Sequence, residues 1–224
     1  MPSRPASIMK QKMRFIFYLF VLFSIFPAQA GSYEDFFRAV IADNPRSIER
    51  LVARGFDPNS VDPDGQPGLV RALHAEAFGV AMALARMPAT DVDLANPAGE
   101  TPLMMAAIKN QLPLAQLLLE RGAQVNRPGW TPLHYAAAGN ALPVLELLLA
   151  RGALVDARAP NGRTPLMMAA LFGEEALVER LIAAGADLRA VDRFDRSAAD
   201  LATAGDREWL GQKLAARAAK QAPR

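Results

Sequence analysis

The sequence contains no cysteine, and it has only two histidines, His74 and His134. The absence of thiols excludes disulfide bonds and thiolate metal sites. It also suits an oxidising compartment, where a stray thiol would be a liability. With so few histidines available, we do not expect a metal cluster, and we predict no cofactor.

Aromatic residues are scarce as well, at 7% of the chain, whereas hydrophobic residues reach 51%. Alanine and leucine supply much of this apolar content, which is typical of small helices packed closely together. The chain of 224 residues is long enough for one domain with a sizeable core.

The familiar catalytic and nucleotide-binding motifs are missing. GxGxxG, GxxxxGK[ST], GxSxG and HExxH do not occur. Aspartate pairs at two turn starts could be taken for metal ligands, but aspartate there usually bonds its own backbone. Adjacent methionine pairs could suggest copper, although core packing explains them better. These residues are Asp62 with Asp64, Asp192 with Asp195, Met104 with Met105, and Met167 with Met168. We therefore predict no catalytic activity and no metal site.

The basic sequence pI of about 9.1 comes from the two ends of the chain. Residues 1–30 contain four basic and no acidic residues, and residues 213–224 contain four more basic residues. The remaining 17 basic residues face 23 acidic ones in the body between them. A mildly acidic body does not favour phosphate backbones, so we expect no nucleic-acid partner.

The N-terminal residues have the pattern of an export signal. A basic stretch over residues 4–14 precedes twelve mainly apolar residues, 15–26, and residues 28–30 have the A-x-A form of a signal-peptidase site. The apolar stretch would rise about 18 Å as a helix, too short for a bilayer core of about 30 Å. We expect residues 1–30 to be cleaved and the mature chain to be periplasmic, with secretion as the alternative and no membrane association after cleavage. Retention as an uncleaved anchor is a further alternative.

A seven-residue segment recurs at nearly constant spacing, and it indicates a stacked repeat. It reads TPLMMAA at 101–107, TPLHYAA at 131–137 and TPLMMAA at 164–170, and a glycine follows each threonine by 21 residues. A period of about 33 residues with T-P-L-H-x-A resembles the ankyrin-repeat family, of an exported bacterial type. The resemblance implies an all-α solenoid of about six helix–turn–helix units with short β-turn fingers.

The same spacing divides residues 31–224 into units with the approximate boundaries 32–61, 62–95, 96–125, 126–158, 159–191 and 192–221. The third, fourth and fifth units carry the repeated motif. The assignment of the first, second and sixth units depends on spacing and on the hydrophobic pattern. Pro88 stands where a glycine would end the second helix of the second unit. The last helix, from Glu208, becomes polar, which suits the end of a finite stack.

The two histidines fit structural positions of such a repeat. In ankyrin-like units the histidine that corresponds to His134 forms hydrogen bonds within its own turn and to the neighbouring turn. Methionines replace it in the flanking units, and they cannot perform acid–base chemistry. His74 has two possible frames: it matches His134 if Leu73 is aligned with Leu133, or it lies at the exposed end of a first helix. The spacing of the neighbouring turns favours the second frame.

The resemblance implies that a partner protein binds along the turn tips and the exposed ends of the first helices. Carried over position by position, this gives a predicted binding strip of nine residues: Ile108, Lys109, Arg127, Trp130, Arg163, Leu171, Phe172, Phe194 and Arg196. The connection before Thr131 is three residues shorter than the one before Thr164, which predicts a notch beside Trp130. Small Ala138 and Gly139 would deepen this notch.

We accordingly expect a monomeric, non-catalytic scaffold that binds another protein through its concave face. One alternative is a secreted effector or inhibitor that acts on a host or competitor protein. An enzyme with an unrecognised site is a second alternative, from another functional class.

Overall fold

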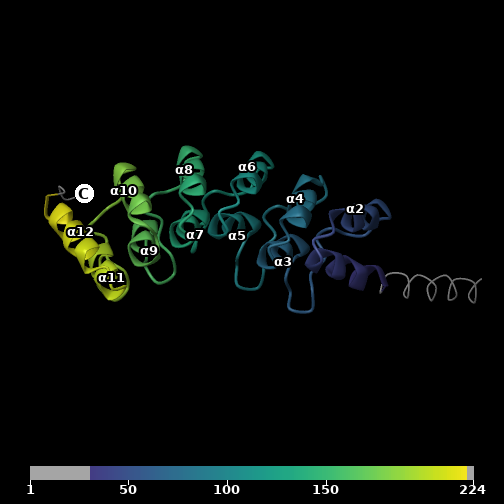
Figure 1. Ribbon diagram of the computed structural model, residues 1–224, viewed down its shortest axis with the longest axis horizontal. Coiled ribbons are helices and arrows are strands. Elements are labelled where there is room, and N and C mark those ends of the chain that lie inside the picture. The colour runs from purple at the N-terminus through teal and green to yellow at the C-terminus, as the bar shows by residue number, and fades with distance from the viewer. Residues whose placement is uncertain (1–30, 221–224) are drawn as a thin grey trace, which may run out of the picture.

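The computed structural model describes residues 31–220, and these residues form twelve helices in two parallel rows (Figure 1). The predicted signal segment, residues 1–30, lies outside the described residues. Within 31–220, no helix is long and apolar enough to cross a membrane. The all-helical solenoid expected from the repeats is confirmed.

Each repeat contributes one helix to each row. The first row comprises the helix over residues 31–41, α3 (Gly68–His74), α5 (Pro102–Ile108), α7 (Pro132–Ala138), α9 (Pro165–Phe172) and α11 (Ala198–Ala204). The second row comprises α2 (Pro45–Ala53), α4 (Phe78–Arg86), α6 (Leu112–Glu120), α8 (Leu142–Ala150), α10 (Glu175–Ala183) and α12 (Glu208–Lys220). The finger loops extend from the side of the first row (Figure 1).

The repeated Thr-Pro pair explains where the first-row helices begin. The Thr101 hydroxyl accepts a hydrogen bond from the Met104 amide, and the Thr164 hydroxyl accepts one from the Met167 amide. Proline follows as the first helical residue, where an amide hydrogen would have no helical partner. Each pair therefore caps one helix and satisfies part of its exposed amide end.

Left-handed residues end the helices. Gly55, Gly122, Gly152 and Gly185 have φ between 81° and 93°, as expected for the glycines that close α2, α6, α8 and α10. The turns inside the units use non-glycine residues in the same conformation: Asp43, Glu76, Asn110, Asn140 and Asp206. Aspartate and asparagine tolerate this region better than most residues.

Two of these turn residues also connect their unit to the next. The Asp43 carboxylate accepts hydrogen bonds from the Gly79 and Val80 amides at the start of α4. The Asn140 side chain accepts from the Glu174 amide at 3.0 Å and donates to the Glu174 carboxylate at 2.6 Å. Each side chain thus caps a second-row helix belonging to its neighbour.

One continuous core runs along the stack between the two rows. The alanine pairs at 106–107, 136–137 and 169–170 have no exposed surface, and their small size lets first-row helices approach closely. In the first unit, Phe36 packs on Phe56 with ring centroids 4.7 Å apart. This aromatic contact fills the end of the core, which has a neighbouring unit on one side only.

The second unit ends its second-row helix without a glycine, and Arg121 of the third unit compensates. Helix α4 ends at Arg86, and Met87 is extended ahead of Pro88, as residues before proline prefer. The Arg121 guanidinium donates to the carbonyls of Ala85, Met87, Pro88 and Thr90 over 2.7–3.2 Å. A single cation therefore satisfies four carbonyls at this helix end.

We expect Arg121→Ala to lower the free energy of unfolding by about 2 kcal/mol, because hydrogen bonds from a charged donor would be lost from partly buried carbonyls. Arg151 follows α8 as Arg121 follows α6, but it is exposed. Arg151→Ala should therefore cost less than about 0.5 kcal/mol. Urea denaturation of both variants checks this, and equal losses would contradict the role given to Arg121.

Candidate functional site

The finger loops are built around polar residues that bond their own backbone. The Oδ1 atom of Asp62 accepts hydrogen bonds from the amides of Asp64 and Gln66. Asp192 does the same with the amides of Phe194 and Arg196. The aspartates at these turn starts therefore shape the fingers. Among residues 31–220, no group of three or more His, Cys, Asp or Glu side chains is placed to hold a metal ion.

His134 joins two units, as predicted. It is fully buried, and its Nδ1 accepts a hydrogen bond from the Thr131 amide at 3.2 Å. Nε2 therefore carries the hydrogen and donates to the Arg163 carbonyl at 3.0 Å. Burial lowers the pKa of His134 to about 4, although its backbone contacts with Arg163 and Ala157 act in the opposite direction. The neutral His134 ring therefore links two neighbouring units through hydrogen bonds.

His74 is the exposed last residue of α3, as the preferred frame predicted. Its Nε2 lies 3.5 Å from a Glu100 carboxylate oxygen. The other carboxylate oxygen of Glu100 accepts a hydrogen bond from the Tyr135 hydroxyl at 3.1 Å. Glu100 thus connects three consecutive units at the base of the fingers.

The predicted notch beside Trp130 is present as an apolar hollow of about 200 Å³. Its lining residues come from three units: Ile108, Trp130, His134, Tyr135, Ala138 and Met168. The Trp130 ring stands nearly perpendicular to the rings of His134 and Tyr135, with centroids 5.3 and 6.4 Å away. The hollow beside the shortened connection over residues 125–130 can therefore hold an apolar group.

Gly139 does not line this hollow, contrary to expectation. A Cβ atom at Gly139 would lie 2.4 Å from the Ile108 carbonyl oxygen. The glycine instead lets the end of α7 pack directly on the backbone at the end of α5. Ala138 does line the hollow, as predicted.

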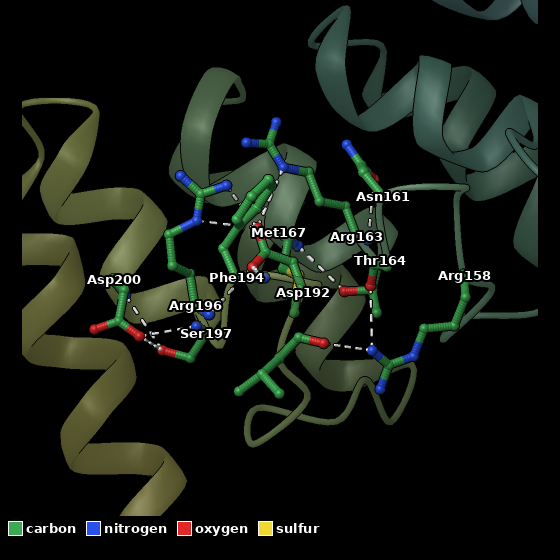
Figure 2. Close-up of polar contacts among 12 residues, drawn as sticks. Arg158, Asn161, Arg163, Thr164, Met167, Asp192, Phe194, Arg196, Ser197 and Asp200 are labelled. Carbon is green, nitrogen blue, oxygen red and sulfur yellow. Dashed lines mark hydrogen bonds and ion pairs between the residues drawn. The ribbon is translucent and has the colours of Figure 1, made fainter.

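The last two fingers carry a second grouping, the arginine cluster, defined as Arg163, Arg193 and Arg196. Figure 2 shows the Arg163 and Arg196 side chains beside Asp192 and Phe194. The buried Asp192 carboxylate accepts hydrogen bonds from Arg196 at 3.1 and 2.7 Å, and the Arg163 Nε lies 3.7 Å away. The Arg196 hydrogen bonds are the main reason that the pKa of Asp192 falls to about 2. The Arg196 guanidinium also lies 5.0 Å from the centre of the Phe194 ring.

The remaining residues of the binding strip differ in how free they are. Phe172 and Phe194 are 58% and 71% exposed. Leu171 is half-buried against the core, and Lys109 is held by Glu76 at 2.7 Å. Arg127 is half-buried in the shortened connection. The strip therefore contains an apolar hollow, two exposed phenylalanines and an arginine cluster.

Three residues that line the hollow were not predicted from the sequence: His134, Tyr135 and Met168. Tyr135 and Met168 occupy the fifth position of the repeated segment, directly after His134 and Met167. Equivalent positions in a repeat point in equivalent directions, so Trp130 beside one such residue was a usable signal. Burial, together with the neighbouring Glu100 carboxylate, raises the pKa of the Tyr135 hydroxyl above its usual range. Tyr135 therefore acts as a hydrogen-bond donor.

Comparison with known families agrees with this architecture. The family model for ankyrin repeats matches in three copies, over residues 36–129, 73–159 and 127–192. The chain belongs to the ankyrin-repeat family, whose members generally mediate protein–protein interactions and are typically non-catalytic.

Similar proteins share part of this chain. It is 34% identical over 131 residues to ankyrin repeat and SAM domain-containing protein 6 of Rattus norvegicus, covering 58% of the chain and 12% of that protein. It is 46% identical over 93 residues to neurogenic locus notch homolog protein 4 of Homo sapiens, covering 40% of the chain and 5% of that protein. The chain thus matches only a small fraction of these longer relatives.

The buried histidine predicts a pH dependence of folding. The unfolded chain binds a proton at His134 near pH 6.5, whereas the folded chain resists protonation until about pH 4. Stability is thus fully present above pH 6.5 and is lost as the pH falls towards 4. We expect the free energy of unfolding to drop by about 2 kcal/mol between about pH 7 and about pH 5.

His134→Met is the matched control for this measurement. The Met104 sulfur accepts from the Thr101 amide at 3.5 Å, so methionine can replace one contact of His134 without a titrating group. The variant should lack most of the pH-dependent loss in urea denaturation. Equal losses in both proteins would show that another group is responsible.

Proposed function

We propose that this chain is a non-catalytic scaffold that binds a periplasmic protein through its binding strip. The observation that carries the proposal is the hollow beside Trp130. Its volume of about 200 Å³ suits one large apolar side chain, and three units converge to form it. Apolar anchors inserted into such hollows dominate many protein interfaces.

The exposed phenylalanines extend this surface. Phe172 ends α9 and Phe194 belongs to the last finger, so both lie on the first-row side of the stack. Phe172 is 58% exposed and Phe194 is 71% exposed, and contact of such large apolar rings with water is unfavourable. A partner that covers them would gain this apolar burial together with the hollow.

The chemistry of the strip favours binding over catalysis. His134 is neutral and fully bonded between two units, and Tyr135 donates to Glu100. Asp192 is held by Arg196 and by finger amides. Each of these titratable groups is occupied in holding the fold, which leaves apolar and guanidinium groups to face a partner. The same surface would serve a secreted effector, which is the alternative.

Export can be tested separately from binding. With the full chain expressed in a bacterial host, N-terminal sequencing of the protein recovered from the periplasm should begin at Gly31. A chain that stays in the cytoplasm and begins at Met1 would contradict periplasmic localisation. Recovery mainly from the culture medium would favour the effector alternative.

Binding is tested by affinity capture from a periplasmic extract, with bound proteins identified by mass spectrometry. Trp130→Ala combined with Phe172→Ala should reduce recovery of the captured protein at least about tenfold, because each change removes a contact worth more than about 1 kcal/mol at an interface.

Leu154→Ala is the matched control. Leu154 is 62% exposed but follows α8, away from the first-row helices. Its variant should capture as much as the unchanged protein. Undiminished recovery of the same protein by the double variant would contradict the proposed surface.

A further inference from the structure

The finger loops change in charge along the stack. The residue that closes each full-length finger is Gln66, Glu100, Arg163 or Arg196, in chain order. Each lies four residues after the finger's first residue, whose amide bonds its carbonyl. The closing position is therefore neutral or acidic in the first half of the stack and basic in the second half.

Basic charge gathers locally although the body is acidic. Residues 158–163 and 191–196 contain four arginines against two aspartates, whereas residues 31–212 as a whole have 17 basic and 23 acidic residues. One aspartate, Asp192, is buried and shared by Arg163 and Arg196. A surplus of positive charge thus faces outward at the last two fingers.

The guanidinium of Arg163 is only loosely held. Its Nε makes no hydrogen bond, and its contact with Asp192 is 3.7 Å. Arg196, in contrast, donates twice to the same carboxylate oxygen. Arg163 is also largely buried, with 18% of its side chain exposed. The Nε atom is buried, so only the terminal nitrogens of this guanidinium could donate to a partner's carboxylate.

Apolar surface lies directly beside these donors. In Figure 2 the Phe194 ring lies between the Arg163 and Arg196 side chains. The carbonyl of Arg163 accepts the His134 hydrogen bond, and His134 lines the hollow next to Trp130. The wall of the hollow is therefore bonded to the backbone of the finger that carries Arg163.

We infer that the last two fingers bind an acidic segment of a partner protein, in which an aspartate or glutamate meets the arginine cluster and a neighbouring large apolar side chain enters the hollow or covers Phe194. This rests on the proposed function and specifies the chemistry of its partner. An extended polyanion such as a nucleic acid fits less well, because the acidic body would repel it beyond this local patch.

The test uses a random peptide library that is displayed on phage and selected for binding to the purified protein. Selected peptides should be enriched in aspartate or glutamate next to a large apolar residue. A selected peptide is then synthesised with its acid-to-amide counterpart, and both are measured by fluorescence polarisation at low and high salt. The acidic form should bind about tenfold more tightly, and high salt should weaken it.

Two variants change the arginine cluster but keep the hydrogen bonds between Arg196 and Asp192. Arg163→Gln leaves the Arg196 hydrogen bonds in place, and Arg193→Gln changes an exposed side chain. Each variant should bind the acidic peptide about threefold to tenfold, or more, less tightly than the unchanged protein. Arg46→Gln is the charge-matched control, since Arg46 is exposed on α2 at the other end of the stack. It should leave the affinity unchanged.

Other results separate the two proposals. Peptides that depend on Trp130 and Phe172, but are not acidic and bind both arginine variants normally, would overturn the acidic partner and leave the proposed function standing. Peptides that depend on neither set would overturn both. Arginine-dependent binding of a single-stranded oligonucleotide, tighter than that of any acidic peptide, would also overturn the inference.

Discussion

The constraint on which this structure depends is that no helix pair can bury its own apolar face. Each inner pair has two apolar sides and must place a neighbour on each, so the core is continuous along the stack. The polar contacts obey the same constraint. Asp43, Arg121 and Asn140 satisfy helix ends of a neighbouring unit. His134 bonds a finger carbonyl of the next unit. Cohesion therefore lies in the interfaces between units.

This constraint explains why the fold was readable from the sequence. A contact that recurs at every interface requires the same residue at the same spacing, and the Thr-Pro pairs and closing glycines record it. The exceptions were less readable. Nothing in the local sequence at Pro88 indicates that Arg121, more than thirty residues later, bonds the end of α4. Likewise the left-handed turn residues vary between Asp, Glu and Asn, and so show no single repeated letter.

Less of the candidate site could be predicted from the sequence, because only the part that changes the repeat spacing is visible there. The shortened connection marked the position of the hollow, because a deletion changes the spacing between repeats and is therefore visible in the sequence. The direction of side chains at that position depends on how closely neighbouring units pack. Gly139 was therefore misplaced: it permits contact between α5 and α7 backbones instead of opening space. The sharing of Asp192 by two arginines depends on the distance between adjacent fingers, which residue spacing does not contain.

The separation between interfaces and fingers also explains how such a chain can acquire specificity. Residues at the interfaces are held by core packing and by bonds to the next unit, so their substitution costs stability. The closing residues of the fingers contribute main-chain hydrogen bonds whatever their side chain is. Charge can therefore vary from Glu100 to Arg196 while this main-chain hydrogen bond is kept. A surface whose main-chain geometry is fixed while its side chains vary is suited to selecting a partner by charge, and the proposed partner would also use the hollow beside Trp130 as an apolar anchor.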